Sequence, residues 1–242
     1  MNKLISIAGT ALALAAVLGS CADKSAKERV AEQRRQWEAS LTDSVASVRR
    51  QTDSVKSRLE SLRSETDRLL GEFRCIDNPR EVEKYYLPSV KGYSYPLTST
   101  GLGARLMANE QLELVAVLSG PRFTGIAISG GDMKLRTHDV VPDQALNYRS
   151  GNITTVAFSG RDIDSIASSL ATMEGKVTVT YFDGGRQVGE TTLSEPQAKA
   201  LLLAGQLAHT RRETLLSEKR LLLLGRKLSM LESREVQKNG ED

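Results

Sequence analysis

The sequence is poor in cysteine, histidine, proline and aromatic residues. Its 242 residues include only two cysteines, two histidines and six prolines, and 5% are aromatic. Two cysteines cannot build a disulfide framework, and two cysteines with two histidines scattered along the chain do not make a zinc-binding pattern. With 26% of residues charged, so few aromatic side chains indicate long helices with narrow apolar faces. We therefore expect no metal or other cofactor, and no compact globule of the chain's full length.

An excess of charge of one sign is also lacking. The chain has 33 basic and 30 acidic residues and a formal net charge of +3. This balance gives no reason to expect a nucleic-acid partner. The sequence also has no G-x-S-x-G nucleophile motif, and Gly125–Gly131 lacks the lysine of a phosphate-binding loop. We therefore expect a protein that is not an enzyme.

One uncharged stretch stands at the N-terminus. Lys3 precedes Leu4–Leu18, a run of fifteen residues rich in Ala and Leu. This run matches the apolar part of a secretory signal and is short for spanning a bilayer core of about 30 Å. The four residues that end this region, Leu18-Gly19-Ser20-Cys21, resemble the lipobox of bacterial lipoproteins.

The resemblance implies that residues 1–20 are a signal peptide and that the thiol of Cys21 is lipidated. Two or three acyl chains hold a protein stably on a bilayer, since each buried CH₂ contributes about 0.8 kcal/mol. Position 22 is Ala rather than Asp, which in enterobacterial lipoproteins favours the outer membrane. Asp23 leaves retention in the inner membrane open, and surface exposure is open too. The alternative is a secreted protein with a chance cysteine near its cleavage site.

Residues 21–74 predict a coiled-coil helix. From Lys24 to about Arg74 there is no proline, and the first glycine is Gly71. Apolar residues and two threonines follow the 4–3 spacing of a coiled-coil seam; they are Val45, Val48, Thr52, Val55, Leu59, Leu62, Thr66, Leu69, Phe73 and Ile76. Trp37 and Leu41 extend this seam toward the N-terminus with a shifted register.

Residues 194–242 predict a second coiled-coil helix. Ser194 and Gln197 have the spacing of a capping pair around Pro196. Additional leucines widen the apolar face, so we expect this helix to contact more than one partner. The seam comprises Leu203, Leu207, Thr210, Thr214, Ser217, Leu221, Leu224, Leu228 and Leu231, and the additional leucines are 201, 202, 215, 216, 222 and 223.

The two helices have similar lengths and flank one middle domain, so we expect them to pair with each other as an antiparallel hairpin. Each helix would then cover the apolar stripe of the other. The alternative is a parallel homo-oligomer.

Residues 75–193 predict a small, mostly β domain with one short helix. Asp183-Gly184-Gly185-Arg186 is a hairpin turn. Asp162–Met173 is expected to be a short helix with Ile163, Ile166, Ala167 and Leu170 turned inward. The overall expectation is an α+β fold with two long helices flanking this domain. The expected strands are Gly92–Leu97, Gln111–Leu118, Phe123–Ser129, Met133–His138, Ile153–Ser159, Lys176–Phe182 and Gln187–Leu193.

Few residues of the middle domain suggest a catalytic or metal-binding role. His138 stands beside Asp139, where a base–carboxylate pair is conceivable, but a surface histidine is the more common case. His209 is expected to be solvated. Asp162 and Asp164 lack the other ligands of a calcium loop, and helix capping explains them better.

Cys75 and a nearby tyrosine cluster are the remaining candidates. We expect Cys75 to be buried as a small apolar side chain; the alternative is a disulfide between two protomers. The tyrosines are expected to cover the edge of a small core, although aromatic rings can also stack on sugars or suit protein interfaces. They are Tyr85, Tyr86, Tyr93 and Tyr95.

The sequence therefore predicts an envelope lipoprotein with a non-catalytic scaffold, adaptor or binding role. Its expected partners are the bilayer, through acylated Cys21, and an envelope protein, with a homo-oligomer open. We expect it on the outer membrane, facing the periplasm. One alternative is an accessory or catalytic subunit acting on cell-envelope carbohydrate. The other is a surface adhesin.

Overall fold

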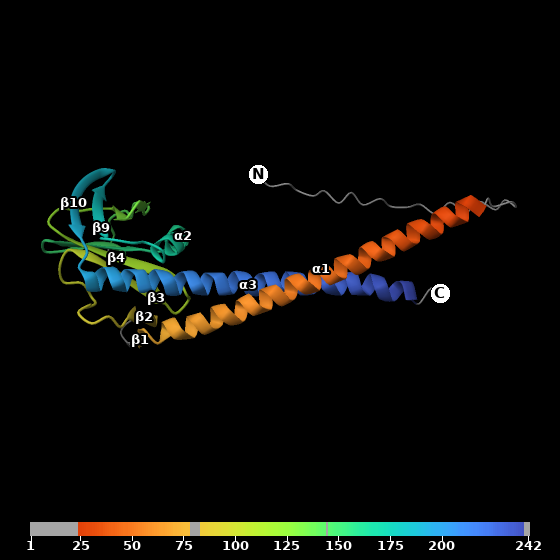
Figure 1. Ribbon diagram of the computed structural model, residues 1–242. Coiled ribbons are helices and arrows are strands. Elements are labelled where there is room, and N and C mark those ends of the chain that lie inside the picture. Colours follow the sequence, from red (N-terminus) through yellow and green to blue (C-terminus); the bar gives the residue numbers. More distant parts are fainter. Residues whose placement is uncertain (1–23, 78–82, 144, 240–242) are drawn as a thin grey trace. The chain divides into compact units, whose positions relative to one another are not determined.

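The computed structural model describes residues 24–77, 83–143 and 145–239. These residues form three helices and two antiparallel sheets, a mixed α+β arrangement with helices at both ends (Figure 1). The chain divides into two compact units, one made of Met1–Arg49 with Leu228–Asp242 and the other of Arg50–Lys227. Both long helices run from one unit into the other.

Helix α1 (Lys24–Leu70) ends four residues earlier than the predicted helix. The amide N–H of Gly71 bonds to the carbonyl of Asp67, and the chain then turns into strand β1. Six positions of the predicted seam are buried: Leu41, Val45 and Val48 in the first unit, and Val55, Leu59 and Leu69 in the second. The predicted extension to Trp37 is wrong, because this side chain is 50% exposed.

Helix α3 (Glu195–Asn239) begins where the capping pair predicts. The side-chain oxygen of Gln197 accepts hydrogen bonds from the backbone N–H and the hydroxyl of Ser194, at 3.2 and 3.1 Å. In the second unit, Arg58 and Arg63 of α1 form ion pairs with Glu213 and Glu218 of α3. Within this unit, 50–70 and 195–227 run in opposite directions (Figure 1), as the predicted hairpin requires.

The first sheet has six strands and the second has four, and every pairing is antiparallel. The first has the order β1 (Phe73–Ile76), β2 (Tyr85–Pro88), β3 (Gly101–Met107), β4 (Leu112–Ser119), β8 (Ile153–Phe158), β7 (Asn147–Ser150). The second has the order β10 (Arg186–Thr192), β9 (Thr178–Asp183), β5 (Gly125–Gly130), β6 (Met133–Arg136).

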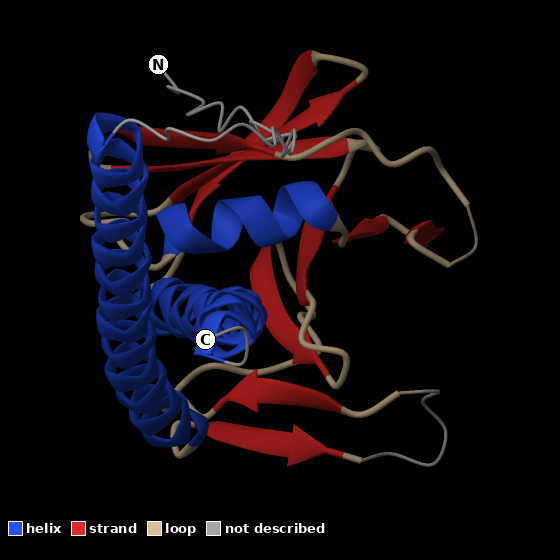
Figure 2. Cartoon of the chain, turned by 90° about the vertical axis from the view of Figure 1, so that its right-hand side faces the viewer, coloured by secondary structure: helices blue, strands red, loops and turns tan. Residues whose placement is uncertain are grey.

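Both sheets contribute to one core with α2 (Arg161–Leu170) and the first part of α3, and the strands bend around these helices (Figure 2). The predicted inward face of α2 is confirmed, since Ile163, Ile166, Ala167 and Leu170 are buried. Tyr181 of the second sheet donates a hydrogen bond to the carbonyl of Gly101 in the first, at 3.0 Å. Its burial raises the pKa of the phenol well above the ordinary value.

The predicted hairpin turn at 183–186 is present between β9 and β10, with Gly184 and Gly185 at φ +54° and +94°. The predicted strand Gly92–Leu97 is wrong: these residues form turns and bends. Gly92 has φ +84°, and Pro96 has no N–H to donate to a strand. Four strands were not predicted, namely β1, β2, β3 and β7.

Candidate binding groove

A groove of about 570 Å³ opens in the second unit between α2, α3 and the turn that joins β3 to β4. Helix α2 lines it with Arg161, Asp164, Ser165 and Ala167. Asp164 is held in place because its carboxylate accepts a hydrogen bond from the N–H of Leu112, at 3.3 Å. The groove therefore has one wall fixed to the sheet by a side-chain contact.

Helix α3 forms the other wall, with both apolar and basic residues. Ala208 is buried, whereas Leu215 and Leu216 are 43% and 49% exposed. Arg212 and Lys219 lie on the same wall. The wall thus combines exposed leucines with cations, a composition suited to binding another molecule rather than to closing the core.

The β3–β4 turn also lines the groove, with Asn109, Glu110 and Gln111. The side-chain oxygen of Asn109 accepts a hydrogen bond from the N–H of Gln111 at 3.1 Å, and its amide donates to the side chain of Gln111. Glu110 has φ +70°, a left-handed conformation uncommon outside glycine. These contacts hold Glu110 in the lining of the groove.

Two further hollows continue the groove along α3. One, of about 340 Å³, shares Glu110 and Leu215 with the first. The next, of about 450 Å³, shares Arg63 and Glu218 with the second and is also lined by Leu222. Together these three hollows follow α3 from Ala208 to Arg226, a span of about 27 Å at ~1.5 Å per residue.

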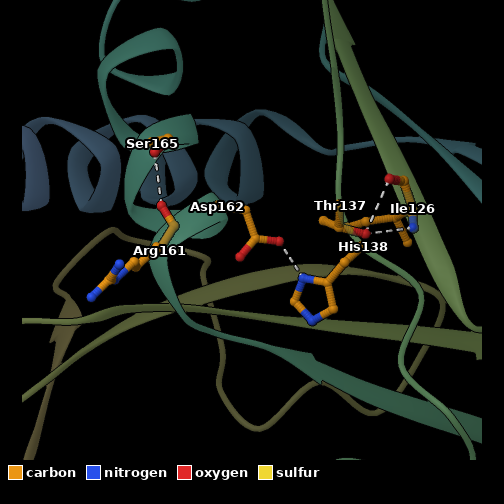
Figure 3. Close-up of polar contacts among 6 residues, drawn as sticks. All are labelled: Ile126, Thr137, His138, Arg161, Asp162 and Ser165. Carbon is orange, nitrogen blue, oxygen red and sulfur yellow. Dashed lines mark hydrogen bonds and ion pairs between the residues drawn. The ribbon is translucent and has the colours of Figure 1, made fainter.

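His138 and Asp162 form a separate polar contact between the end of β6 and the start of α2 (Figure 3). The pairing considered in the sequence, His138 with Asp139, is wrong: Asp139 instead accepts a hydrogen bond from the hydroxyl of Thr124, at 2.8 Å. The capping role considered for Asp162 is also wrong. Gly160 occupies the cap position of α2, without a side-chain hydrogen bond.

The environment of Asp162 favours its charged form. Desolvation raises the pKa of its carboxyl, but hydrogen bonds from His138 and from a backbone N–H, with the charge of His138, lower this pKa below its ordinary value overall. The nearby hydroxyls are engaged elsewhere. Ser165 donates to the carbonyl of Arg161 and Thr137 bonds to the backbone of Ile126 (Figure 3). The contact between His138 and Asp162 is therefore suited to holding α2 against β6.

The structure places the other predicted residues apart from the groove. Cys21 and its lipobox lie outside the described residues. Cys75 lies in β1, and its expected burial is wrong, because β1 is an edge strand and this side chain is exposed. His209 is half-buried on α3.

The tyrosine cluster lies mostly on the face of the first sheet that points away from the core, and only Tyr86 packs against the core as expected. Tyr85 and Tyr93 are buried, and the guanidinium of Arg105 lies 4.7 Å from the centre of the Tyr85 ring. Arg105 also forms an ion pair with buried Glu113, at 2.6 Å. This cluster therefore stabilises the outer side of the first sheet.

The residues that line the groove were not predicted as a site. A signal for them does exist in the sequence: Leu215 and Leu216 are followed seven residues later by Leu222 and Leu223. The excess of leucine is visible in the sequence, but which of these leucines are exposed depends on elements far away in the chain.

No described helix has the length and hydropathy of a membrane span. Within the described ranges, no group of three or more His, Cys, Asp or Glu residues is arranged to hold a metal ion. Comparison with models of known protein families, with curated proteins and with solved structures finds no match to this chain.

Proposed function

We propose that this protein is a lipid-anchored envelope lipoprotein whose folded part binds another envelope protein as a scaffold or adaptor. The anchoring half of the proposal rests on Leu18-Gly19-Ser20-Cys21 at the end of an apolar N-terminal run. Ala22 supports the outer membrane as the location.

The binding half rests on the groove along α3. Four leucines of this helix are between 43% and 63% exposed, and three of them line the groove. Exposing them costs free energy, at roughly 25 cal/mol per Å² of apolar surface. A surface of this kind, bordered by charged side chains, is typical of a site that binds another molecule.

We also propose that α1 and α3 pair as an antiparallel coiled coil. Support comes from the burial of Val55 and Leu59 on α1 and of Ser217 and Leu224 on α3, all at positions of the predicted seams. The ion pairs Arg58–Glu213 and Arg63–Glu218 flank these positions, as charges beside a coiled-coil seam do.

The anchor is tested by Cys21→Ser in the full chain. We expect this variant to lose metabolic acyl labelling and to move from the membrane to the soluble fraction, because the variant lacks the thiol that carries the lipid. Gradient separation of the two membranes tests the location of the unchanged protein. Acyl labelling that persists in Cys21→Ser would contradict the anchor.

The binding role is tested by photo-crosslinking in cells. Leu216 is replaced by a photo-crosslinking amino acid, and Val141, 78% exposed and outside the groove, is replaced in a matched control. We expect a discrete crosslinked protein from position 216 and not from position 141. Equal crosslinking from both positions, or none from either, would contradict a binding role for the groove.

A further inference from the structure

The exposed face of α3 repeats with a period of seven residues. Arg212, Lys219 and Arg226 are spaced by seven, and so are the pairs Leu215-Leu216 and Leu222-Leu223. Seven residues make nearly two turns of a helix, so each set forms a row along α3. We call Arg212, Lys219 and Arg226 the cationic row.

The cationic row lies between two rows of leucine. Lys219 follows Leu215 by four residues and Leu216 by three, and residues with these spacings are neighbours on a helix surface. Leu215 and Leu216 themselves are about 100° apart around the axis. The face therefore presents a central line of cations with an apolar line on each side.

The cationic row lacks partners among the residues that the structure describes. The carboxylates nearest in sequence, Glu213 and Glu218, bind Arg58 and Arg63 of α1 instead. Among the described residues, no member of the row forms an ion pair. Arg161 of α2 adds a cation across the groove. The acidic residues of the lining are Glu110, Asp67, Asp164 and Glu218, of which Asp164 accepts a hydrogen bond from Leu112 and Glu218 binds Arg63.

Gly225 marks the apolar section of the groove, which Leu59, Leu221 and Leu222 also line. A Cβ added at Gly225 would meet nothing within 4 Å. Glycine inside a helix costs roughly 1 kcal/mol relative to alanine, and a missing side chain allows the backbone of a bound segment to approach closely. A bound segment therefore has room to approach the backbone of α3 at Gly225.

We propose that this groove binds an amphipathic helix of a partner protein, with acidic side chains facing the cationic row and apolar side chains beside Leu215 and Leu222. This proposal deepens the binding role proposed above and rests on it. A helix suits a groove about 27 Å long because that length equals five turns. It also satisfies its own backbone hydrogen bonds, whereas an extended segment would need a strand edge, and the groove is lined by helices and one turn.

Other occupants fit the face less well. A bilayer surface is flat, so inserting both leucine rows would also draw the cations between them toward the hydrocarbon. A second copy presenting the same face would set one cationic row against another, and like charges oppose binding. An acidic helix neutralises the row and covers the leucines together.

The test measures binding to the mature chain, residues 21–242, with Cys21→Ser so that no lipid is attached. The probe is a synthetic peptide of three heptads with two leucines in each heptad and glutamate at the flanking positions. A second peptide has lysine in place of every glutamate. We expect the acidic peptide to bind at least roughly tenfold more tightly than the basic one. Its affinity should fall as added salt screens the charges.

Two double variants locate the binding. Leu222→Gln with Arg226→Gln removes residues that line the groove, and we expect affinity for the acidic peptide to fall roughly tenfold. Val141→Gln with Lys134→Gln is the control. It removes one exposed apolar and one exposed basic side chain of the same unit, with Val141 78% exposed. Neither control residue lines the groove or belongs to α3, so affinity should stay within about twofold.

Circular dichroism checks that both variants remain folded. Equal losses in the two variants, or no preference for the acidic peptide, would overturn the proposal. Self-association in sedimentation that only the groove variant abolishes would assign the groove to a second copy. Binding to phosphatidylglycerol vesicles without peptide binding would assign it to the membrane. Crosslinking from position 216 in cells with no peptide binding would retain the binding role and overturn only the acidic helix.

Discussion

The first and second parts of α3 within the larger unit, residues 195–210 and 211–227, are both rich in leucine, but their surroundings differ. In the first part, Ala200, Leu201, Ala204 and Leu207 are at most 1% exposed. The second part exposes Leu215, Leu216, Leu222 and Leu223. The sheets and α2 cover the first part, whereas the second leaves one face open beside α1. Apolar spacing thus shows how much surface a helix could bury, and the neighbouring elements decide how much it does bury.

The largest expected difference between the two parts is the effect of shortening a leucine. Leu207 is fully buried in the core, so Leu207→Ala should lower the free energy of unfolding by about 3 kcal/mol through lost burial and a cavity. Leu222, 58% exposed, is the matched position, and Leu222→Ala should change stability by less than about 0.5 kcal/mol. Urea unfolding followed by circular dichroism measures both. Similar losses for the two variants would mean that the second part is buried as deeply as the first.

Glycine-to-alanine substitutions should change the free energy of unfolding in opposite directions in the two parts of α3. A Cβ at Gly205 would lie 2.6 Å from the Cβ of Leu170 and 3.2 Å from the N of Ala171, so Gly205→Ala must push α2 away from α3. We expect this substitution to lower the free energy of unfolding by about 2 kcal/mol. A Cβ at Gly225 would meet no atom within 4 Å. Gly225→Ala should therefore raise the free energy of unfolding by up to about 1 kcal/mol, because alanine favours the helix. Thermal unfolding checks both signs, and a stabilising Gly205→Ala would show that α2 and α3 are not in close contact.

The elements predicted correctly are those specified by local sequence. The start of α3 follows from Ser194 and Gln197, whose side chains meet within one turn. The inward face of α2 follows from the spacing of its isoleucines, and the β9–β10 turn from two adjacent glycines with positive φ. Each of these needs only residues that are neighbours in the chain.

The missed elements depend on distant residues. Strand β3 contains two glycines, which weaken a strand prediction. A Cβ at Gly103 would lie 3.0 Å from the hydroxyl of Tyr93, and one at Gly101 would lie 2.6 Å from the side-chain nitrogen of Gln197. These glycines allow close packing that the local sequence does not reveal. The groove was missed for the same reason, since its walls come from α1, α2, α3 and the β3–β4 turn.

A smaller effect should follow acidification, because His138–Asp162 holds α2, which packs against the first part of α3 at Gly205. The pKa of Asp162 is lowered in the folded chain. Its contribution to stability is therefore present above the unfolded value of about 3.9 and is lost as pH falls through the lower folded value. Both side chains are more than a third exposed, so Asp162→Asn should cost less than about 1 kcal/mol at pH 7.

The difference between Asp162→Asn and the unchanged protein should narrow as pH falls below about 4. Asp132→Asn, at an exposed position, serves as the control variant. Urea unfolding at several pH values measures both variants. A cost of Asp162→Asn that is constant from pH 7 to pH 3 would mean that packing or helix propensity, rather than the charge of the carboxylate, causes it.

The smallest expected effect concerns the charges that join the second part of α3 to α1. Arg63 and Glu218 form an ion pair at 2.8 Å, with side chains 59% and 43% exposed. Because water and salt screen such a pair, a double-mutant cycle with Arg63→Gln and Glu218→Gln should give a coupling of a few tenths of a kcal/mol. This coupling should shrink further in 1 M salt, where the Debye length is about 3 Å. If buried leucines such as Leu59 and Leu224 hold the two helices together, the double variant should keep its full helicity in circular dichroism. A coupling above about 1 kcal/mol that persists in salt would instead show that charge holds the second part of α3 in place.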